Sequence, residues 1–168
     1  MTAICALGVD PGPVPGFFLA AWSPGEREAA WTRAYQCNAG GAEGLLIMLL
    51  GMMEGTQRIL DYGPVTACGQ IEEFRTRSGA GSTGRNASVT REQVVTLGAL
   101  AAERGVRLAV RHSSAVFPWC SDKRLQAAGL REATTGLVHA RAASRHCLFA
   151  AVRDGGLPDP LSTRAVPG

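Results

Sequence analysis

The stretch of sequence that decides the fold is Ala6-Leu7-Gly8-Val9-Asp10-Pro11-Gly12-Pro13. It ends an apolar run that starts at Ala3, and such an uninterrupted run predicts a strand that is buried on both faces. Pro11-Gly12 then stops the strand in a turn. Asp10 has two interpretations: a carboxylate that needs a cation or another partner once it is buried, or a polar turn residue that helps to reverse the chain. Both remain open from this stretch alone.

The composition is typical of a globular domain. The chain has 168 residues, of which 46% are hydrophobic and 18% are charged, and this length suits one domain with a sizeable core. Five cysteines without paired spacing predict reduced thiols in a cytoplasmic protein. The apolar run from Leu45 to Leu50 is too short to span a membrane. We therefore expect no membrane partner, and the N-terminal residues do not predict a signal peptide.

The basic residues are almost all arginine. The net charge is +3, and Lys123 is the single lysine among 17 basic residues. Arginine is suited to bidentate contacts with phosphate. A genome rich in G and C would also raise the arginine content, and it explains most of the excess.

The pattern of apolar residues predicts an α/β protein. Three short strands separated by turns indicate an antiparallel meander, and helices then alternate with two further strands. This order predicts a mixed five-stranded sheet flanked by helices. The expected strands are 3–9, 17–22, 29–37, 65–74 and 107–112, and the expected helices are 38–60, 90–104 and 135–152.

Two segments are expected to be irregular. The stretch from Arg75 to Thr90 is rich in glycine, arginine and small hydroxyl residues, which predicts a mobile loop. Thr90 and Gln93 fit a capping box at the start of the helix that follows. The proline-containing tail after Gly155 is expected to fray.

Candidate site residues lie at the end of the fourth expected strand and on the last helix. Glu72 and Glu73 point to opposite faces of the strand, so only one of them can share a site with Asp10. Two carboxylates at one sheet edge require a divalent cation, or one of them takes up a proton. The last helix carries His139, Ala142, Ala143 and His146 on one face. Taken singly, a surface acidic pair and a solvated histidine are the better interpretations.

The ordered set of these motifs carries a resemblance. Gly8-Val9-Asp10-Pro11-Gly12, then Gln70-Ile71-Glu72, then His139-x-x-Ala142-Ala143 resemble the motifs of RuvC-like Holliday junction resolvases, which belong to the RNase H-like nuclease superfamily. The stretch from Pro118 to Leu125 is similar to the segment before the last helix in resolvase-like proteins of actinobacteria and their phages. The resemblance covers about residues 3 to 152 and implies an RNase H-like fold.

The resemblance implies a metal site with one departure. In that family the first-strand aspartate, the fourth-strand glutamate and two residues at i and i+3 on the last helix hold two Mg²⁺ ions, for which Mn²⁺ can substitute. These positions are Asp10, Glu72, His139 and Ala142, and an alanine has no ligand atom. The chain is therefore expected to bind the metal pair poorly and to cleave slowly or not at all. Two explanations compete: a natural pseudo-nuclease, or a deliberate Asp→Ala change, which is favoured because the other three residues are in place.

The function implied by the resemblance is structure-selective cleavage of four-way or branched DNA by two-metal phosphodiester hydrolysis. The alternative is a junction-binding protein without catalysis. A homodimer is expected because a four-way junction offers two symmetric strands, and the location implied is the cytoplasm of a bacterial or phage-infected cell. The nuclease domain is expected to span 1–155, with a tail over 156–168. The expected DNA contacts are Arg75, Arg77, Arg85, Arg91, Lys123 and Arg124.

Overall fold

A computed structural model describes residues 2–59, 64–73 and 84–162, except for the side chains of residues 57–59 and 85. Its centre is a five-stranded sheet with the order β3-β2-β1-β4-β5. The strands are β1 (Ala3–Asp10), β2 (Gly16–Trp22), β3 (Trp31–Gln36), β4 (Val65–Glu72) and β5 (Leu108–Arg111). The first three strands are antiparallel neighbours, whereas β4 and β5 run parallel to β1. The predicted mixed α/β sheet is confirmed.

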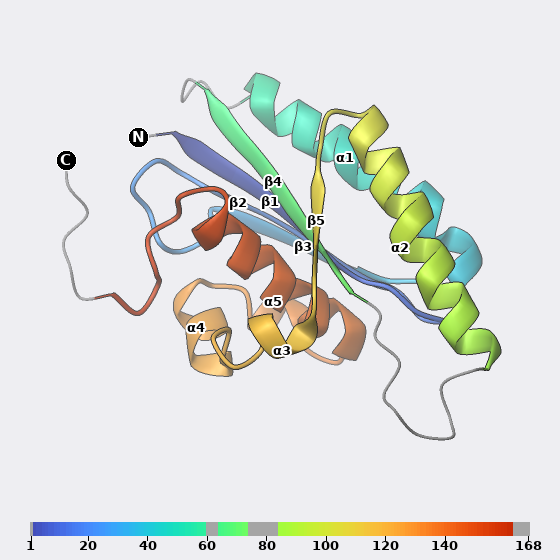
Figure 1. Ribbon diagram of the computed structural model, residues 1–168. Helices are drawn as coiled ribbons and strands as arrows, with labels where there is room; N and C mark the ends of the chain where they lie inside the picture. The colour runs from blue at the N-terminus through green and yellow to red at the C-terminus, as the bar shows by residue number, and fades with distance from the viewer. Residues whose placement is uncertain (1, 60–63, 74–83, 163–168) are drawn as a thin grey trace.

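Helices cover both faces of the sheet (Figure 1). Helices α1 (Ala42–Ile59) and α2 (Arg85–Glu103) lie on one side, while α5 (Val138–Arg153) lies across the other with α3 (Ser113–Val116) and α4 (Asp122–Ala127) beside it. Two short 3₁₀ turns, η1 (Ala39–Gly41) and η2 (Glu132–Thr134), precede α1 and α5. The order of the long elements is the one that the sequence predicts.

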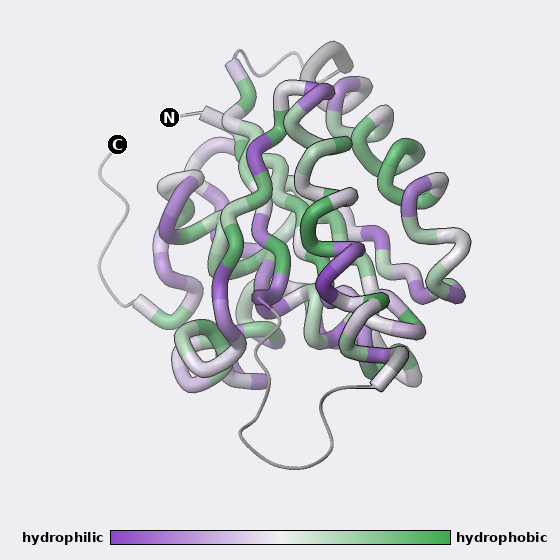
Figure 2. The backbone as a smooth tube through the Cα atoms, turned by 45° about the vertical axis from the view of Figure 1, so that its right-hand side comes forward, coloured by the Kyte–Doolittle hydropathy of each residue, from purple (hydrophilic) through white to green (hydrophobic). Residues whose placement is uncertain are grey.

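The central strand β1 is buried on both faces, as its apolar run predicts. Cys5, Leu7 and Val9 pack with the core beneath α1 and α2, and Ala6 packs with the core beneath α5. This alternation follows from the two-residue period of a strand. By the two-residue period of the strand, Gly8 and Asp10 belong to the face that α5 covers. Figure 2 shows that hydrophobic and hydrophilic segments also alternate along the helices.

The predicted start of the second long helix is wrong. Helix α2 begins at Arg85 with Gly84 as its N-cap, so Thr90 lies inside the helix. There the Thr90 hydroxyl donates to the carbonyl of Asn86, while Gln93 Oε1 accepts a hydrogen bond from Gly12 N at 2.7 Å. Both side chains of the expected capping box therefore have other partners.

The expected fraying of the tail is also wrong for its first part. Leu157 is buried in the core beneath α5. Asp159 accepts two hydrogen bonds from the guanidinium of Arg124, at 3.0 and 3.1 Å. Burial of an apolar side chain and a bidentate ion pair outweigh the disorder that the prolines favour. In the part of the chain that the structure describes, no helix is both long and apolar enough to span a membrane.

Candidate functional site

The ends of two parallel strands bring Asp10 and Glu72 to the same edge of the sheet. Val9 of β1 is in register with Ile71 of β4, and each carboxylate follows directly as the last residue of its strand. The strand period directs both side chains to the face that α5 covers. Asp10 is 15% exposed and Glu72 is 23% exposed. Two acidic groups thus share a half-buried edge beneath the last helix.

Helix α5 places His139 against Asp10. His139 Nδ1 lies 2.9 Å from Asp10 Oδ2, so the imidazole donates a hydrogen bond to the carboxylate. The start of the helix is fixed by Gln36 at the end of β3, whose Oε1 accepts from His139 N at 2.7 Å and from Ala140 N at 3.3 Å. Leu137 at the N-cap makes no side-chain hydrogen bond. Gln36 therefore supplies the cap from another element and holds His139 at this edge.

Two turns further along α5, His146 lies against Glu72. His146 Nε2 is 3.4 Å from Glu72 Oε2, which is a long polar contact. The site thus contains two acid–histidine pairs, Asp10 with His139 and Glu72 with His146. The sequence placed His146 on the face of His139, but it assigned no role to this residue. The signal that could have found it is the i+7 spacing between the two histidines.

The electrostatic environments of the two carboxylates differ. Burial raises the pKa of Asp10 to about 6, with the charge of Glu72 acting in the same direction and the hydrogen bond from His139 opposing it. Burial also acts to raise the pKa of Glu72. The combined effect of the neighbouring His146, Ser113 and His112 is larger and in the opposite direction, so the pKa of Glu72 lies below its usual value. The negative charge of Asp10 is therefore less well compensated than that of Glu72. A bound cation would stabilise the ionised form of Asp10.

Replacement of Asp10 by Asn is expected to stabilise the fold in a pH-dependent way. The pKa of Asp10 is about 6 in the folded chain against the ordinary 3.8, so folding opposes its ionisation. The resulting penalty is absent below about pH 4, grows as the pH rises and is complete above about pH 6. Two pKa units correspond to about 2–3 kcal/mol. We therefore expect the Asp10→Asn advantage in the free energy of unfolding to grow by this amount from about pH 4 to about pH 8.

Urea denaturation of both proteins in the presence of a chelator measures this difference. The chelator matters because a bound cation would remove the penalty from the parent. An advantage that stays constant across the pH range would show that Asp10 is not destabilised by its ionisation.

The donor set suits a divalent cation, but it is incomplete. Carboxylate oxygens are ligands for Mg²⁺ and Mn²⁺, and imidazole is a ligand for Mn²⁺ and other transition metals. Among the described residues, however, no three His, Cys, Asp or Glu side chains form a group that could hold a metal ion. Ala142 lies on α5 between the two histidines and is partly exposed. The donor atoms of these residues are of the kinds that bind a divalent cation, and Ala142, where the resemblance implies an aspartate, has no ligand atom.

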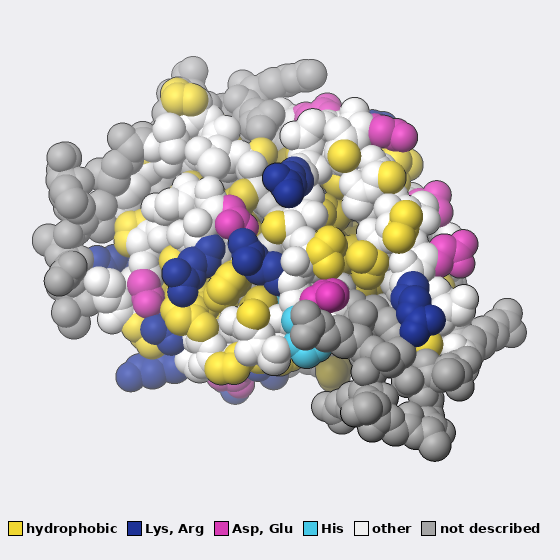
Figure 3. Space-filling model, in the orientation of Figure 1, with side chains coloured by type: hydrophobic (Ala, Val, Ile, Leu, Met, Phe, Trp, Pro, Cys, Tyr) yellow, Lys and Arg dark blue, Asp and Glu magenta, His cyan; other side chains and the backbone are white. Residues whose placement is uncertain are grey.

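The expected DNA contacts fall into three groups. Arg75 and Arg77 lie outside the described residues, and Arg85 begins α2 but its side chain is not described. Arg91 on α2 and Lys123 on α4 are exposed. Arg124 binds Asp159, donates to the carbonyl of Trp119 at 2.8 Å and stacks over the Trp119 ring, so the structure gives it a role within the fold. Basic side chains gather over α5 and the segment of α3 and α4 (Figure 3).

Comparison with known proteins supports the fold. No model of a protein family matches the chain, and no curated protein does. Among solved structures, the chain is similar to T. thermophilus RuvC in complex with a Holliday junction substrate, with a TM-score of 0.56 and 14% sequence identity. The similarity covers 93% of this chain and 96% of that one. The chain therefore has a RuvC-like fold over nearly its whole length.

Proposed function

We propose that this protein binds four-way or otherwise branched DNA and that its scaffold is that of a structure-selective endonuclease with cleavage weakened by Ala142. The observation that carries the proposal is the pair of carboxylates, Asp10 and Glu72, at the edge of a RuvC-like sheet beneath two histidines of α5. Such a concentration of acidic and imidazole groups is costly to the fold and is typical of a site for chemistry.

The proposed site residues have distinct tasks. Asp10, Glu72 and His139 are the residues that would hold Mg²⁺ or Mn²⁺. Such ions, when bound there, would supply an activated water and stabilisation of the leaving oxygen of a phosphodiester. His139 fixes the carboxylate of Asp10 through the 2.9 Å hydrogen bond. Gln36 fixes His139 in turn, so the helix end does not depend on DNA for its orientation.

A second candidate is junction binding without cleavage. Two observations favour it. Position 142 is an alanine, and the residues that the structure describes contain no group of three His, Cys, Asp or Glu side chains that could hold a metal ion. The two candidates share the DNA-binding step and differ only in the chemistry.

We also propose a homodimer with a two-fold axis, because each half of a symmetric junction then meets one copy of the site. The nuclease domain would span 1–155.

A binding assay with a synthetic four-way junction and a linear duplex of the same sequence tests the shared step. The assay is carried out in a chelator, so that cleavage does not consume the junction. We expect tighter binding to the junction than to the duplex. Equal affinity for the two DNAs would contradict both candidates.

The arginines just before α2 and at its first residue are expected to dominate the electrostatic part of binding. Replacing Arg75, Arg77 and Arg85 together by Ala should weaken junction binding and flatten its dependence on salt. For every phosphate that the protein no longer neutralises, the slope of log affinity against log salt becomes shallower by about 0.9. Titrations of a labelled junction over a range of salt concentrations measure this slope.

The double replacement Arg104→Ala and Arg107→Ala is the matched control. These exposed arginines follow the C-terminal end of α2, at the opposite end of the helix from Arg85. The control variant should keep the slope of the parent. A triple variant with the parent's slope would show that the segment before α2 and the first residue of α2 are not part of the DNA-binding surface.

A further inference from the structure

His146 is the buried polar group that the fold explains least. Its side chain is fully buried, Nδ1 has no hydrogen-bond partner among the described residues, and Nε2 makes only a long contact of 3.4 Å with Glu72 Oε2. Buried polar groups without partners destabilise a fold, and the great majority of them are satisfied. An apolar side chain of similar size would serve packing better. This residue therefore needs a reason other than the stability of the core.

The imidazole of His146 is directed toward the proposed site. Its Nε2 lies 3.4 Å from Glu72 Oε2. Side chains of an α-helix tilt toward its N-terminus, so the ring of His146 lies over the preceding turn, which contains Ala142.

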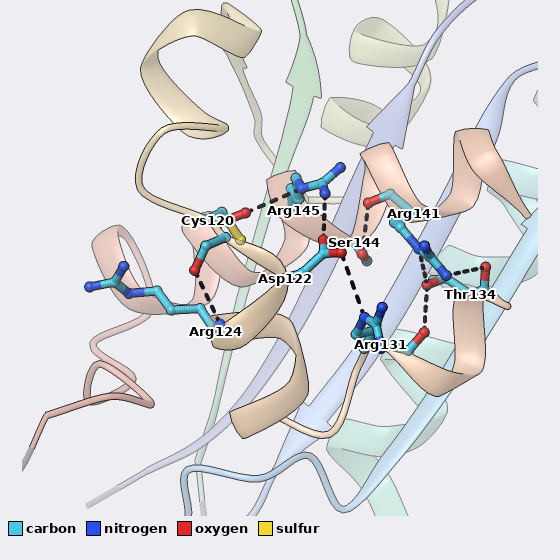
Figure 4. A network of polar contacts seen from close by, with 9 residues as sticks. Cys120, Asp122, Arg124, Arg131, Thr134, Arg141, Ser144 and Arg145 are labelled. Carbon is cyan, nitrogen blue, oxygen red and sulfur yellow. Dashed lines mark hydrogen bonds and ion pairs between the residues drawn. The ribbon is translucent and has the colours of Figure 1, made fainter.

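The His146 ring packs against Phe117, which lies next to the polar network of Arg145, Asp122 and Arg131 that Figure 4 shows. Phe117 packs edge-on against the imidazole, with ring centroids 5.9 Å apart. The guanidinium of Arg145 lies over Phe117 at 5.0 Å, and it donates to Asp122 at 2.7 Å and to the carbonyl of Cys120 at 3.2 Å. Asp122 is in turn within 3.6 Å of Arg131. This network limits the freedom of Phe117 and therefore that of the imidazole.

We propose that His146 is a positioning residue that holds the carboxylate of Glu72 toward Asp10 and so prepares it to bind a divalent cation. The proposal rests on the proposed function for the identity of the ligand. His146 acts through Glu72 and does not itself contact DNA, since its side chain is fully buried. Ligating carboxylates in metal sites are commonly oriented in this way by a hydrogen-bonding neighbour.

Two variants of the full chain test the role, His146→Leu and His146→Gln. Leu is of similar size and has no polar atom, whereas Gln can place an amide N–H near the position of Nε2. Mn²⁺ affinity is measured from the loss of the spectroscopic signal of the free ion, and stability is measured by thermal unfolding. We expect His146→Leu to unfold at a higher temperature and to bind Mn²⁺ about 10- to 100-fold more weakly. His146→Gln should retain affinity within about threefold, as a partial replacement for the missing hydrogen-bond donor.

The outcomes separate the two levels of the proposal. Parental Mn²⁺ affinity in His146→Leu would overturn the positioning role, and so would loss of both affinity and stability in the two variants alike, because that result indicates packing. A parent that does not bind Mn²⁺ would overturn the role as well. Junction binding in a chelator is measured separately, so its failure identifies a failure of the proposed function itself.

Discussion

Ala142→Asp is expected to produce cleavage of a four-way junction in Mg²⁺ or Mn²⁺, at a rate at least about 100-fold above that of the parent. A metal ion contributes several kcal/mol of transition-state stabilisation, and about 1.4 kcal/mol corresponds to a tenfold change in rate. The position suits the change because it lies on α5 between His139 and His146 and is partly exposed. A carboxylate there needs no space in the core. Paired, symmetric nicks in a labelled junction are the measured product.

Ala142→Asn is the matched control for this substitution. Asn has nearly the same shape as Asp but lacks its charge, so it should give little or no increase in cleavage. Without metal, Ala142→Asp should bind the junction as the parent does or slightly more weakly, because it adds negative charge near phosphate. If Ala142→Asp binds the junction and still does not cleave it in either metal, the missing ligand is not the cause of inactivity. Junction binding without cleavage would then be the better description.

The parts of the fold that could be predicted are those whose signal is local. The uninterrupted apolar run of β1 indicated a doubly buried strand, and α1 carries Leu46, Leu49, Leu50 and Met53 at helical spacing on its buried face. These patterns depend only on neighbours in the sequence. The order of the long elements follows from them, and with it the mixed character of the sheet.

The errors occurred where a distant partner competes with a local motif. Gln93 fits a capping box, but its amide oxygen accepts instead from Gly12, which is 81 residues away in sequence. Leu157 lies in a segment rich in proline, but it is buried against the core beneath α5. No local window contains either partner. The short helices α3 and α4 were not predicted; each begins at a side-chain N-cap, His112 or Ser121, and is too short to be stable without tertiary packing.

The contacts of the candidate site also depend on partners that are distant in the sequence, so only some of its residues could be predicted. A resemblance between motifs singled out Asp10, Glu72 and His139, and the structure brings Asp10 and His139 to hydrogen-bonding distance. The contacts made by Gln36 and His146 depend on how α5 crosses the sheet, which the sequence pattern does not contain. The close approach of α5 to the sheet depends on two strand glycines, Gly8 and Gly16, where a Cβ would meet the backbone of the helix.

Gly8→Ala is expected to lower the free energy of unfolding by about 3 kcal/mol or more, because the added methyl group overpacks a rigid contact. A Cβ at Gly8 would collide with the carbonyl oxygen of Ala143 and lie 2.5 Å from Cys147 N. Both are backbone atoms of α5, so no side-chain rotation relieves the clash. Gly16 meets the same helix at His139 and Ala140. The strands therefore require glycine at these two positions, where an added Cβ would meet the backbone of α5.

Gly51→Ala is the control, because a Cβ at this exposed position of α1 has no neighbour within 4 Å. Alanine is favoured over glycine inside a helix by about 0.5–1 kcal/mol, so this variant should be slightly more stable than the parent. Urea unfolding monitored by circular dichroism gives both values. Since α5 carries His139, a Gly8→Ala protein that still folds should also show a shifted imidazole resonance for His139, as the helix moves away from Asp10. Equal stability of Gly8→Ala and the parent would mean that α5 does not lie in contact with β1, and the pairing of Asp10 with His139 would lose its structural basis.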